Sequence, residues 1–360
     1  WLDYDKQWIS DGGGIFSRQA KSILISEPMK QRFGITAGRL APNDLIRAML
    51  RAPVDLLWNG GIGTYIKSIS EIHGDVGDKA NDPLRINGCE VQAKVVGEGG
   101  NLGLSQLGRV EYALQEGALN TDFIDNSGGV DCSDHEVNIK ILLNEIVASG
   151  DMTLKQRNQL LESMTSDVAE LVLTNNYRQT QAISLAESEA CFRMDEYRRF
   201  MEHLEGLGKL DRSIEFLPDT EALAERSASG KGLTRPELSL LISYSKADLK
   251  EALINSSMID DEYLAREMNS AFPEVLVNRF PRAIEQHRLR REIIATQIAN
   301  HMIDMMGITY AHRLQLTTGA SSPEIARAFT VSRDVFGISR YWQMIEQLDY
   351  KVSSALQHRM

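Results

Sequence analysis

Glycine and asparagine residues gather in two short blocks whose composition suits contact with a small polar ligand. The first block, residues 95–101, has the sequence VVGEGGN, and the second, residues 126–136, has the sequence NSGGVDCSDHE. Glycines let the backbone approach a ligand closely, and an asparagine side chain offers both a donor and an acceptor. Each block follows a short β-branched run and precedes an amphipathic helical pattern, so both are predicted to be ligand-contacting strand-to-helix turns.

A third glycine turn, residues 59–63 with the sequence NGGIG, follows a predicted buried strand at residues 54–57. Because the carboxyl ends of parallel strands lie along one edge of a sheet, we expect all three turns to line that edge, where ligands bind. The alternative is purely structural: Asn126 caps the next helix and the glycines only make the turns. Three such turns along one edge favour a ligand site.

The first block comes close to a dinucleotide-binding fingerprint without matching it. Residues 97–103 have the sequence GEGGNLG, whereas the fingerprint requires G-x-G-x-x-G and the sixth position here holds Leu102. No acidic residue ends a strand about 20 residues further on, as that fingerprint also demands. The block is therefore interpreted either as a turn that contacts a part of a ligand other than a pyrophosphate, or as a structural turn.

Other motifs are weaker. Cys132 and His135 have a metal-like spacing without a second pair, and the acidic stretch at residues 75–82 lacks the alternation of a calcium loop, so no metal is expected. Residues 12–18, with the sequence GGGIFSR, could bind an anion or form a plain turn.

Composition excludes several classes of function. The chain has 360 residues and a formal net charge of −11 without a basic block, which argues against nucleic-acid binding. No run approaches about eighteen apolar residues, so no membrane span or membrane partner is expected. Three cysteines, far apart and odd in number, favour a reducing, cytoplasmic location. Because the first residue is Trp1 rather than Met, we expect a piece of a longer protein.

Short strands alternate with helices in the predicted pattern of the first part of the chain. Strands are expected at residues 54–57, 91–96 and 121–125, and helices at residues 43–52 with Asn43 as N-cap, 105–115 and about 129–147. This order indicates a parallel α/β sheet.

After Gly150 the pattern is helical. Long helices are expected at residues 154–174 and 283–306, the second ended by Gly307, and the TRPE sequence at residues 234–237 predicts a capped helix start. The absence of any strand pattern predicts an all-helical domain.

Taken together, the two glycine blocks resemble glutamate dehydrogenases, in which one strand ends in E-G-A-N and a later one leads into N-A-G-G-V-x-x-S. Further segments resemble the large bacterial NAD-specific class of that family: residues 12–18, 55–65, 120–122, 130–138 and 233–238. The resemblance covers essentially the whole chain.

This resemblance implies an α/β fold followed by an all-α fold: the distal part of a Rossmann-type, NAD-binding domain at residues 1–149 and a C-terminal helical domain at residues 150–360. It implies oxidative deamination of L-glutamate to 2-oxoglutarate and ammonia, with hydride transfer to NAD, by a full-length enzyme that forms a homo-oligomer. The family's catalytic lysine and aspartate and its dinucleotide fingerprint are expected upstream. No catalytic residue is therefore assigned, and the chain alone is expected to be inactive.

The family motifs place Asn101 and Asn126 at the nicotinamide end of NAD. They place Ser133 near the substrate side-chain carboxylate, which suits a hydroxyl at a helix N-terminus. The other predicted cofactor-binding residues lie in the turns after the first two strands: Asn59, Gly60, Gly61, Gly63, Glu98 and Gly99.

The chain departs from the smaller members of the family at several of these positions. Gly100 and Ser127 replace alanines, residues 102–104 (LGL) replace G-P-T, and Thr64 stands where those enzymes carry an asparagine. Two other functions are compatible with the sequence. One is a non-catalytic helical assembly or regulatory module in which the sheet is a structural remnant. The other is a different amino-acid dehydrogenase of the superfamily, although Ser133 favours a dicarboxylate substrate.

Overall fold

The computed structural model describes residues 3–360, so Trp1 and Leu2 lie outside the described residues. It divides into two compact units. Unit 1 contains the described residues up to Asn126 together with Thr234–Pro236, and unit 2 contains Ser127–Leu233 and Glu237–Met360.

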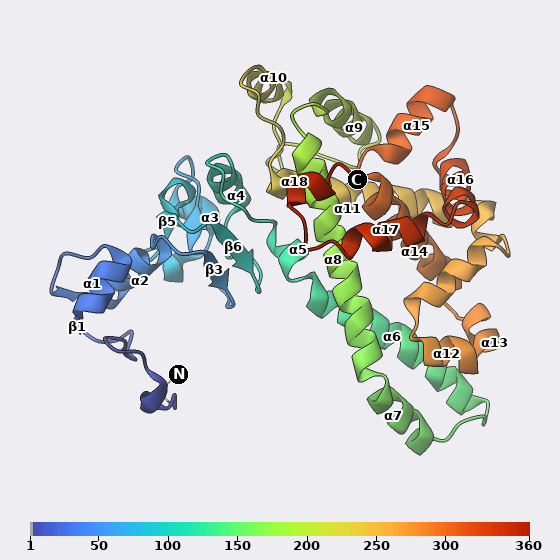
Figure 1. Cartoon of the computed structure of the whole chain (residues 1–360), viewed down its shortest axis with the longest axis horizontal. Coiled ribbons are helices and arrows are strands. Elements are labelled where there is room, and N and C mark those ends of the chain that lie inside the picture. The colour runs from blue at the N-terminus through green and yellow to red at the C-terminus, as the bar shows by residue number, and fades with distance from the viewer. Residues whose placement is uncertain (1–2) are drawn as a thin grey trace. The chain divides into compact units, whose positions relative to one another are not determined.

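Unit 1 consists of short strands and helices joined by long loops (Figure 1). Its elements are η1 (Lys6–Trp8), β1 (Ile23–Leu24), α1 (Glu27–Phe33), β2 (Arg39–Leu40), α2 (Pro42–Leu50), β3 (Leu56–Asn59), β4 (Ile66–Lys67), α3 (His73–Val76), η2 (Lys79–Asn81), β5 (Ile86–Asn87), η3 (Gly88–Glu90), β6 (Val95–Glu98), α4 (Gln106–Ala113) and α5 (Asp122–Asp125).

The sheets of unit 1 are small, and the central one is parallel. β3 pairs with β6 in parallel with Asn59 opposite Glu98, so the two strands end side by side at the same edge. Ala118 continues this sheet on the far side of β6 through a parallel bridge to Val95. β4 and β5 also pair in parallel, whereas β1 and β2 are antiparallel. The predicted α/β character of the first part of the chain is thus confirmed.

The core of unit 1 explains how α4 is fixed behind the sheet. Val96 of β6 is buried in one cluster with Ile66, Leu104 and Tyr112. Ser105 caps α4 by accepting a hydrogen bond from the amide of Gly108. A Cβ at Gly108 would lie 2.9 Å from the Lys67 backbone, so glycine permits the close approach of α4 to β4.

The strand predicted at residues 121–125 is wrong, because these residues form the single-turn helix α5. A helical turn brings the carboxylates of Asp122 and Asp125 to one side, where they accept backbone N–H groups of Leu102 and Glu98 at 2.7 and 3.0 Å. These hydrogen bonds to distant backbone groups stabilise the helical turn, although the short β-branched sequence pattern favours a strand. The Asn43 cap is also wrong, since α2 starts at Pro42 with Ala41 as N-cap.

Unit 2 contains no strand among its residues, which the structure describes throughout, and the predicted all-helical character is confirmed. Its elements are α6 (Ser127–Ala148), α7 (Leu154–Ser163), α8 (Thr165–Glu189), α9 (Met194–Gly206), α10 (Thr220–Ala228), α11 (Arg235–Ile254, whose first two residues count with unit 1), η4 (Ser257–Asp260), η5 (Leu264–Ala271), α12 (Glu274–Arg279), α13 (Pro281–Glu285), α14 (Arg290–Met306), α15 (Tyr310–Thr318), α16 (Ser322–Val335), α17 (Ile338–Glu346) and α18 (Ser354–Gln357).

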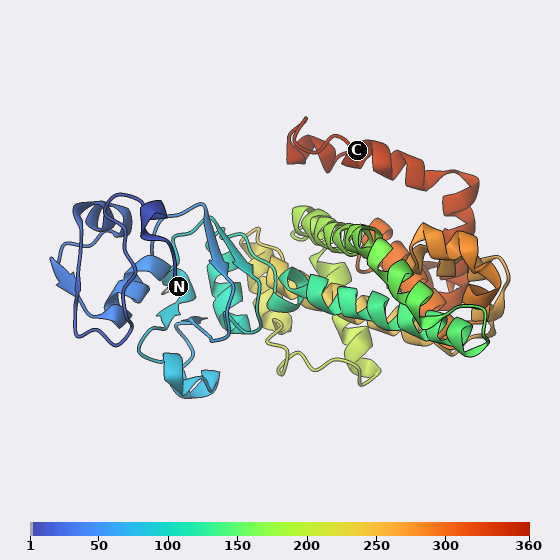
Figure 2. The ribbon, with the colours of Figure 1, turned by 90° about the horizontal axis from the view of Figure 1, so that it is seen from below.

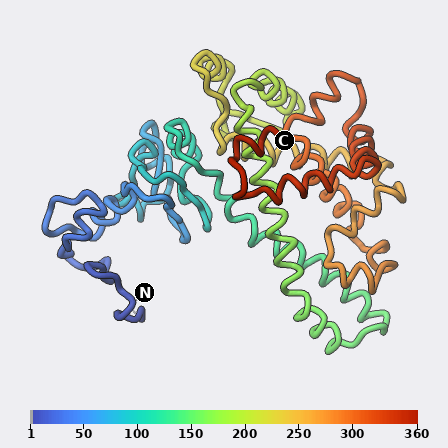
Figure 3. The backbone as a smooth tube through the Cα atoms, viewed as in Figure 1, coloured from blue at the N-terminus to red at the C-terminus, as the bar shows by residue number. Residues whose placement is uncertain are grey.

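The long helices α6, α8 and α14 form the centre of unit 2, and α8 packs against both of the others (Figures 2 and 3). α14 buries Ile294, Ile298 and Met302, residues of the predicted apolar stripe. None of the described helices is both long and apolar enough to span a bilayer.

Two predicted helices are interrupted in the structure. The helix expected at residues 154–174 ends at Ser163 and restarts at Thr165. The helix expected at residues 283–306 is broken because the Nδ1 atom of buried His287 accepts the Leu289 amide at 3.0 Å. The predicted stop at Gly307 is confirmed, with a φ of 94°.

Compactness divides the chain between Asn126 and Ser127, at the start of α6, whereas the sequence predicts a functional boundary at residues 149/150, just after the end of α6. The two divisions differ by this one helix. The assignment of residues 1–149 to one functional domain stays a prediction.

Candidate functional site

Two of the three predicted turns, which follow β3 and β6, meet at the carboxyl edge of the β3–β6 sheet. The third prediction is wrong as a strand-to-helix turn, because Asn126 follows the helix α5 and α6 begins at the next residue. The Gly99 amide donates to the Asn59 carbonyl at 2.9 Å, which joins the first two turns. A Cβ at Gly100 would lie 3.1 Å from the Gly61 carbonyl oxygen, so the turns are closely packed there. The side-chain amide of Asn126 donates to the Asn101 side-chain oxygen at 2.9 Å. The edge therefore carries a joined pair of asparagines.

Part of the glycine content at this edge is explained by packing. The exposed indole of Trp58 covers Gly97 and Gly99, and a Cβ at Gly97 would lie 2.6 Å from the ring. Trp58 pairs with Gly97 in the sheet register. For these two glycines the structural interpretation has direct support.

A cavity of about 280 Å³ lies within unit 1 beside the first two turns. Its polar lining includes Arg18, Asn59 and Tyr65, and its apolar lining includes Leu57 and Leu104. The Asn59 side-chain nitrogen is buried and has no hydrogen-bond partner. An unpaired donor at a cavity wall fits a ligand that offers an acceptor, such as a carboxamide.

Glu98 points into the interior of unit 1. Its carboxylate binds the Arg109 guanidinium with contacts of 2.7 and 3.0 Å, and it accepts the Leu104 amide at 3.0 Å. Arg109 also pairs with Asp122 at 3.2 Å. Burial raises the pKa of the Glu98 carboxyl, Arg109 works against this rise, and Asp122 adds to it. The Glu98 side chain therefore fixes the turn from within.

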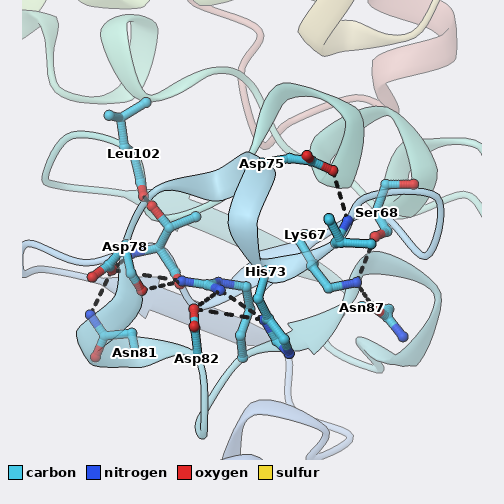
Figure 4. A network of polar contacts seen from close by, with 12 residues as sticks. Lys67, Ser68, His73, Asp75, Asp78, Asn81, Asp82, Asn87 and Leu102 are labelled. Carbon is cyan, nitrogen blue, oxygen red and sulfur yellow. Dashed lines mark hydrogen bonds and ion pairs between the residues drawn. The ribbon is translucent and has the colours of Figure 1, made fainter.

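A polar network centred on Arg85 holds the turn at residues 59–63, and this network was not predicted from the sequence (Figure 4). The fully buried Arg85 side chain donates to the Asp82 carboxylate at 2.6 Å and to the Thr64 carbonyl at 2.8 Å. Asp78 accepts the Thr64 amide at 2.8 Å and the Asn81 side chain at 2.7 Å (Figure 4). One feature of the sequence could have indicated the network: acidic and basic residues in this segment are spaced three residues apart. The polar composition of the segment alone predicts only a solvent-exposed loop.

The residues of the second block that follow Asn126 belong to α6 in unit 2. Gly128 and Gly129 lie in the first turn of this helix, and the exposed Ser133 donates to the Gly129 carbonyl at 3.1 Å. His135 is buried and its Nδ1 atom is hydrogen-bonded to the Ala271 carbonyl at 3.0 Å, whereas Cys132 is exposed. Among residues 3–360 no group of three or more metal-ligating side chains is arranged to hold a metal ion.

The parallel strands of unit 1 end in glycine and asparagine turns beside a cavity, and a helical unit follows them in the chain. These features define an α/β ligand-binding class of protein. Comparison with known sequences gives the family. The model for the catalytic domain of bacterial NAD-glutamate dehydrogenase matches residues 1–186, and the model for the C-terminal part of glutamate dehydrogenase matches residues 230–360. The chain belongs to the bacterial NAD-glutamate dehydrogenase family.

The chain is similar over nearly its full length to proteins named NAD-specific glutamate dehydrogenase. It is 61% identical over 357 residues to the protein of Pseudomonas aeruginosa, covering 99% of this chain and 22% of that protein. It is 55% identical to that of Halomonas elongata, covering 100% of this chain, and 44% identical to that of Mycobacterium tuberculosis, covering 98%. The chain thus spans about 22% of the length of each of these relatives.

Proposed function

We propose that this chain forms the nicotinamide-facing part of an NAD-dependent glutamate dehydrogenase that catalyses oxidative deamination of L-glutamate to 2-oxoglutarate and ammonia. The β3–β6 pair, continued by Ala118, is then the distal part of a Rossmann-type sheet. The catalytic lysine and the dinucleotide fingerprint belong, in this proposal, to the part of the relatives that the chain does not span. The proposal also includes a homo-oligomeric state and a cytoplasmic location for the complete enzyme.

The residues at the carboxyl edge fit the nicotinamide end of NAD. The buried, unpartnered amide nitrogen of Asn59 offers a donor, and the pair formed by the exposed Asn101 and the half-buried Asn126 offers further donors and acceptors. In the proposal Gly61, where a Cβ would meet no atom within 4 Å, lets the backbone approach the ring, Gly60, Gly63 and Gly99 shape the turns around it, and Glu98 holds its turn rigid. NAD, when bound, accepts a hydride from the amino acid. In the proposal Ser133 contacts the substrate side-chain carboxylate.

The observation that carries the proposal is the meeting of two glycine turns at one parallel-sheet edge, with Asn126 at the end of α5 bonded to the second turn, within residues that the family's catalytic-domain model matches. The structural alternative explains Gly97 and Gly99 through Trp58. It gives no reason for the buried Asn59 nitrogen without a hydrogen-bond partner.

The test is an assay of the complete enzyme and of the 360-residue chain, with a panel of amino acids and with NAD or NADP. The complete enzyme is expected to reduce NAD with L-glutamate and the isolated chain to show no turnover. Preference of the complete enzyme for another amino acid would support the alternative dehydrogenase. Turnover by the isolated chain would contradict the division of the active site proposed here.

A further inference from the structure

Leu102, at the tip of the turn after β6, has a backbone conformation that is costly for its residue type. Its φ is 56°, in the left-handed region where a Cβ is crowded against the backbone. Glycine takes this conformation without penalty. A strained non-glycine residue at a candidate site points to a role for its side chain.

Hydrogen bonds from two other segments hold Leu102 in this conformation. Its amide donates to the Asp122 carboxylate at 2.7 Å, and its carbonyl accepts the Thr64 hydroxyl at 2.7 Å. Thr64 is in turn fixed by Asp78, which accepts its amide, and by Arg85, which donates to its carbonyl. The Thr64 hydroxyl therefore fixes Leu102 through its hydrogen bond, and Thr64 is buried, with 7% of its surface exposed.

The Leu102 side chain contributes little to the core. It is 61% exposed, and Figure 4 shows it directed away from the labelled residues of the Arg85 network. It follows Asn101, the residue that bonds to Asn126. The folded unit therefore holds a branched apolar side chain in solvent, on the residue that follows Asn101, in a backbone conformation that glycine would adopt more easily.

We propose that Leu102 is a cofactor-contacting residue whose side chain packs against the flat nicotinamide ring, and that Thr64 and Asp122 are the positioning residues that present it. This inference rests on the proposed function. It explains why a leucine is held in this conformation: the apolar contact with the ring offsets the backbone strain.

The test compares Leu102→Gly with Glu116→Gly in the complete enzyme. Glu116 is exposed and also has a positive φ, 67°, but it lies at the end of α4, outside the candidate site. Both substitutions relieve the backbone, so the thermal midpoint should hold or rise for each. Leu102→Gly should weaken NAD binding about tenfold by calorimetry, equal to about 1.4 kcal/mol, and change the KM for glutamate less than twofold.

A second pair of variants tests the positioning role. Thr64→Val removes the hydroxyl that holds Leu102 and should also weaken NAD binding several-fold, whereas Thr64→Ser should retain it. NAD binding that is unchanged in Leu102→Gly overturns the inference and leaves the proposed function intact. Failure of the unsubstituted enzyme to bind NAD overturns both.

Discussion

Gly103 shows how closely the first two turns fit each other. A Cβ at this residue would overlap the side-chain nitrogen of Asn59 and would lie 3.0 Å from a Glu98 carboxylate oxygen. Asn59 ends β3 and Glu98 ends β6, so Gly103 closes the space between two adjacent strands. Asn59 and Gly103 both line the cavity, and Glu98 forms the buried pair with Arg109.

Gly103→Ala should therefore lower the free energy of unfolding by about 1–3 kcal/mol, because either Asn59 or the turn must move. Urea unfolding followed by tryptophan fluorescence measures this change. Gly61→Ala is the matched control, since a Cβ there meets no atom within 4 Å. Equal stability of the two variants would show that the fit around Gly103 is loose.

At the scale of residues, part of the site could be predicted from the topology of a parallel sheet. Turns after parallel strands share an edge, and that rule places the turns that bear Asn59 and Asn101 together. The rule does not explain the position of Asn126, which follows the helix α5 and reaches Asn101 through a side-chain hydrogen bond. The inward orientation of Glu98 was not predictable, because its partner Arg109 is recognised only once α4 packs behind β6. The role of Arg85 likewise depends on tertiary contacts that its own segment does not reveal.

Elements defined by periodicity or by glycine were predicted well, and elements defined by distant partners were not. α4, α6 and the end of α14 at Gly307 follow from apolar spacing and capping. α5 was mistaken for a strand because its aspartates are drawn to backbone amides far along the chain. The break before α14 comes from a single buried histidine, His287, which no periodicity signals.

Three elements of unit 2 are tied together by a buried charged cluster. Glu267 of η5 binds His301 of α14 at 2.9 Å and the Arg333 guanidinium of α16. Burial alone would raise the pKa of Glu267, but His301 and Arg333 lower it to about 2. Because the folded pKa lies below the ordinary value of 4.5, the cluster stabilises the fold above about pH 5.

This stabilisation should be lost as the pH falls from about 5 through about 2, with an amplitude of about 3 kcal/mol from the Glu267 shift. Thermal unfolding across this pH range measures it. Glu267→Gln should lower the midpoint at neutral pH and flatten the acid dependence. Glu262→Gln, at an exposed carboxylate nearby, should do neither. If the thermal midpoint of Glu267→Gln still fell at acid pH, other carboxylates would be responsible for the acid dependence of stability.

At the scale of the whole molecule, the chain pairs an α/β unit that carries Asn59, Asn101 and Asn126 with a larger helical unit that carries Ser133. Both halves match models of one enzyme family, and the 22% coverage of the relatives agrees with an active site completed by other residues.

The central claim is that the edge bearing Asn101 and Asn126 binds the nicotinamide end of NAD. The most direct measurement is the steady-state kinetics of the complete enzyme carrying Asn126→Ala, with Asn158→Ala, an exposed asparagine on α7, as control. Loss of one to two hydrogen bonds predicts an increase of about tenfold in the KM for NAD and a lower kcat, with the control unchanged. An Asn126→Ala enzyme with unaltered KM for NAD and unaltered kcat would contradict the claim and leave the sheet as a structural remnant.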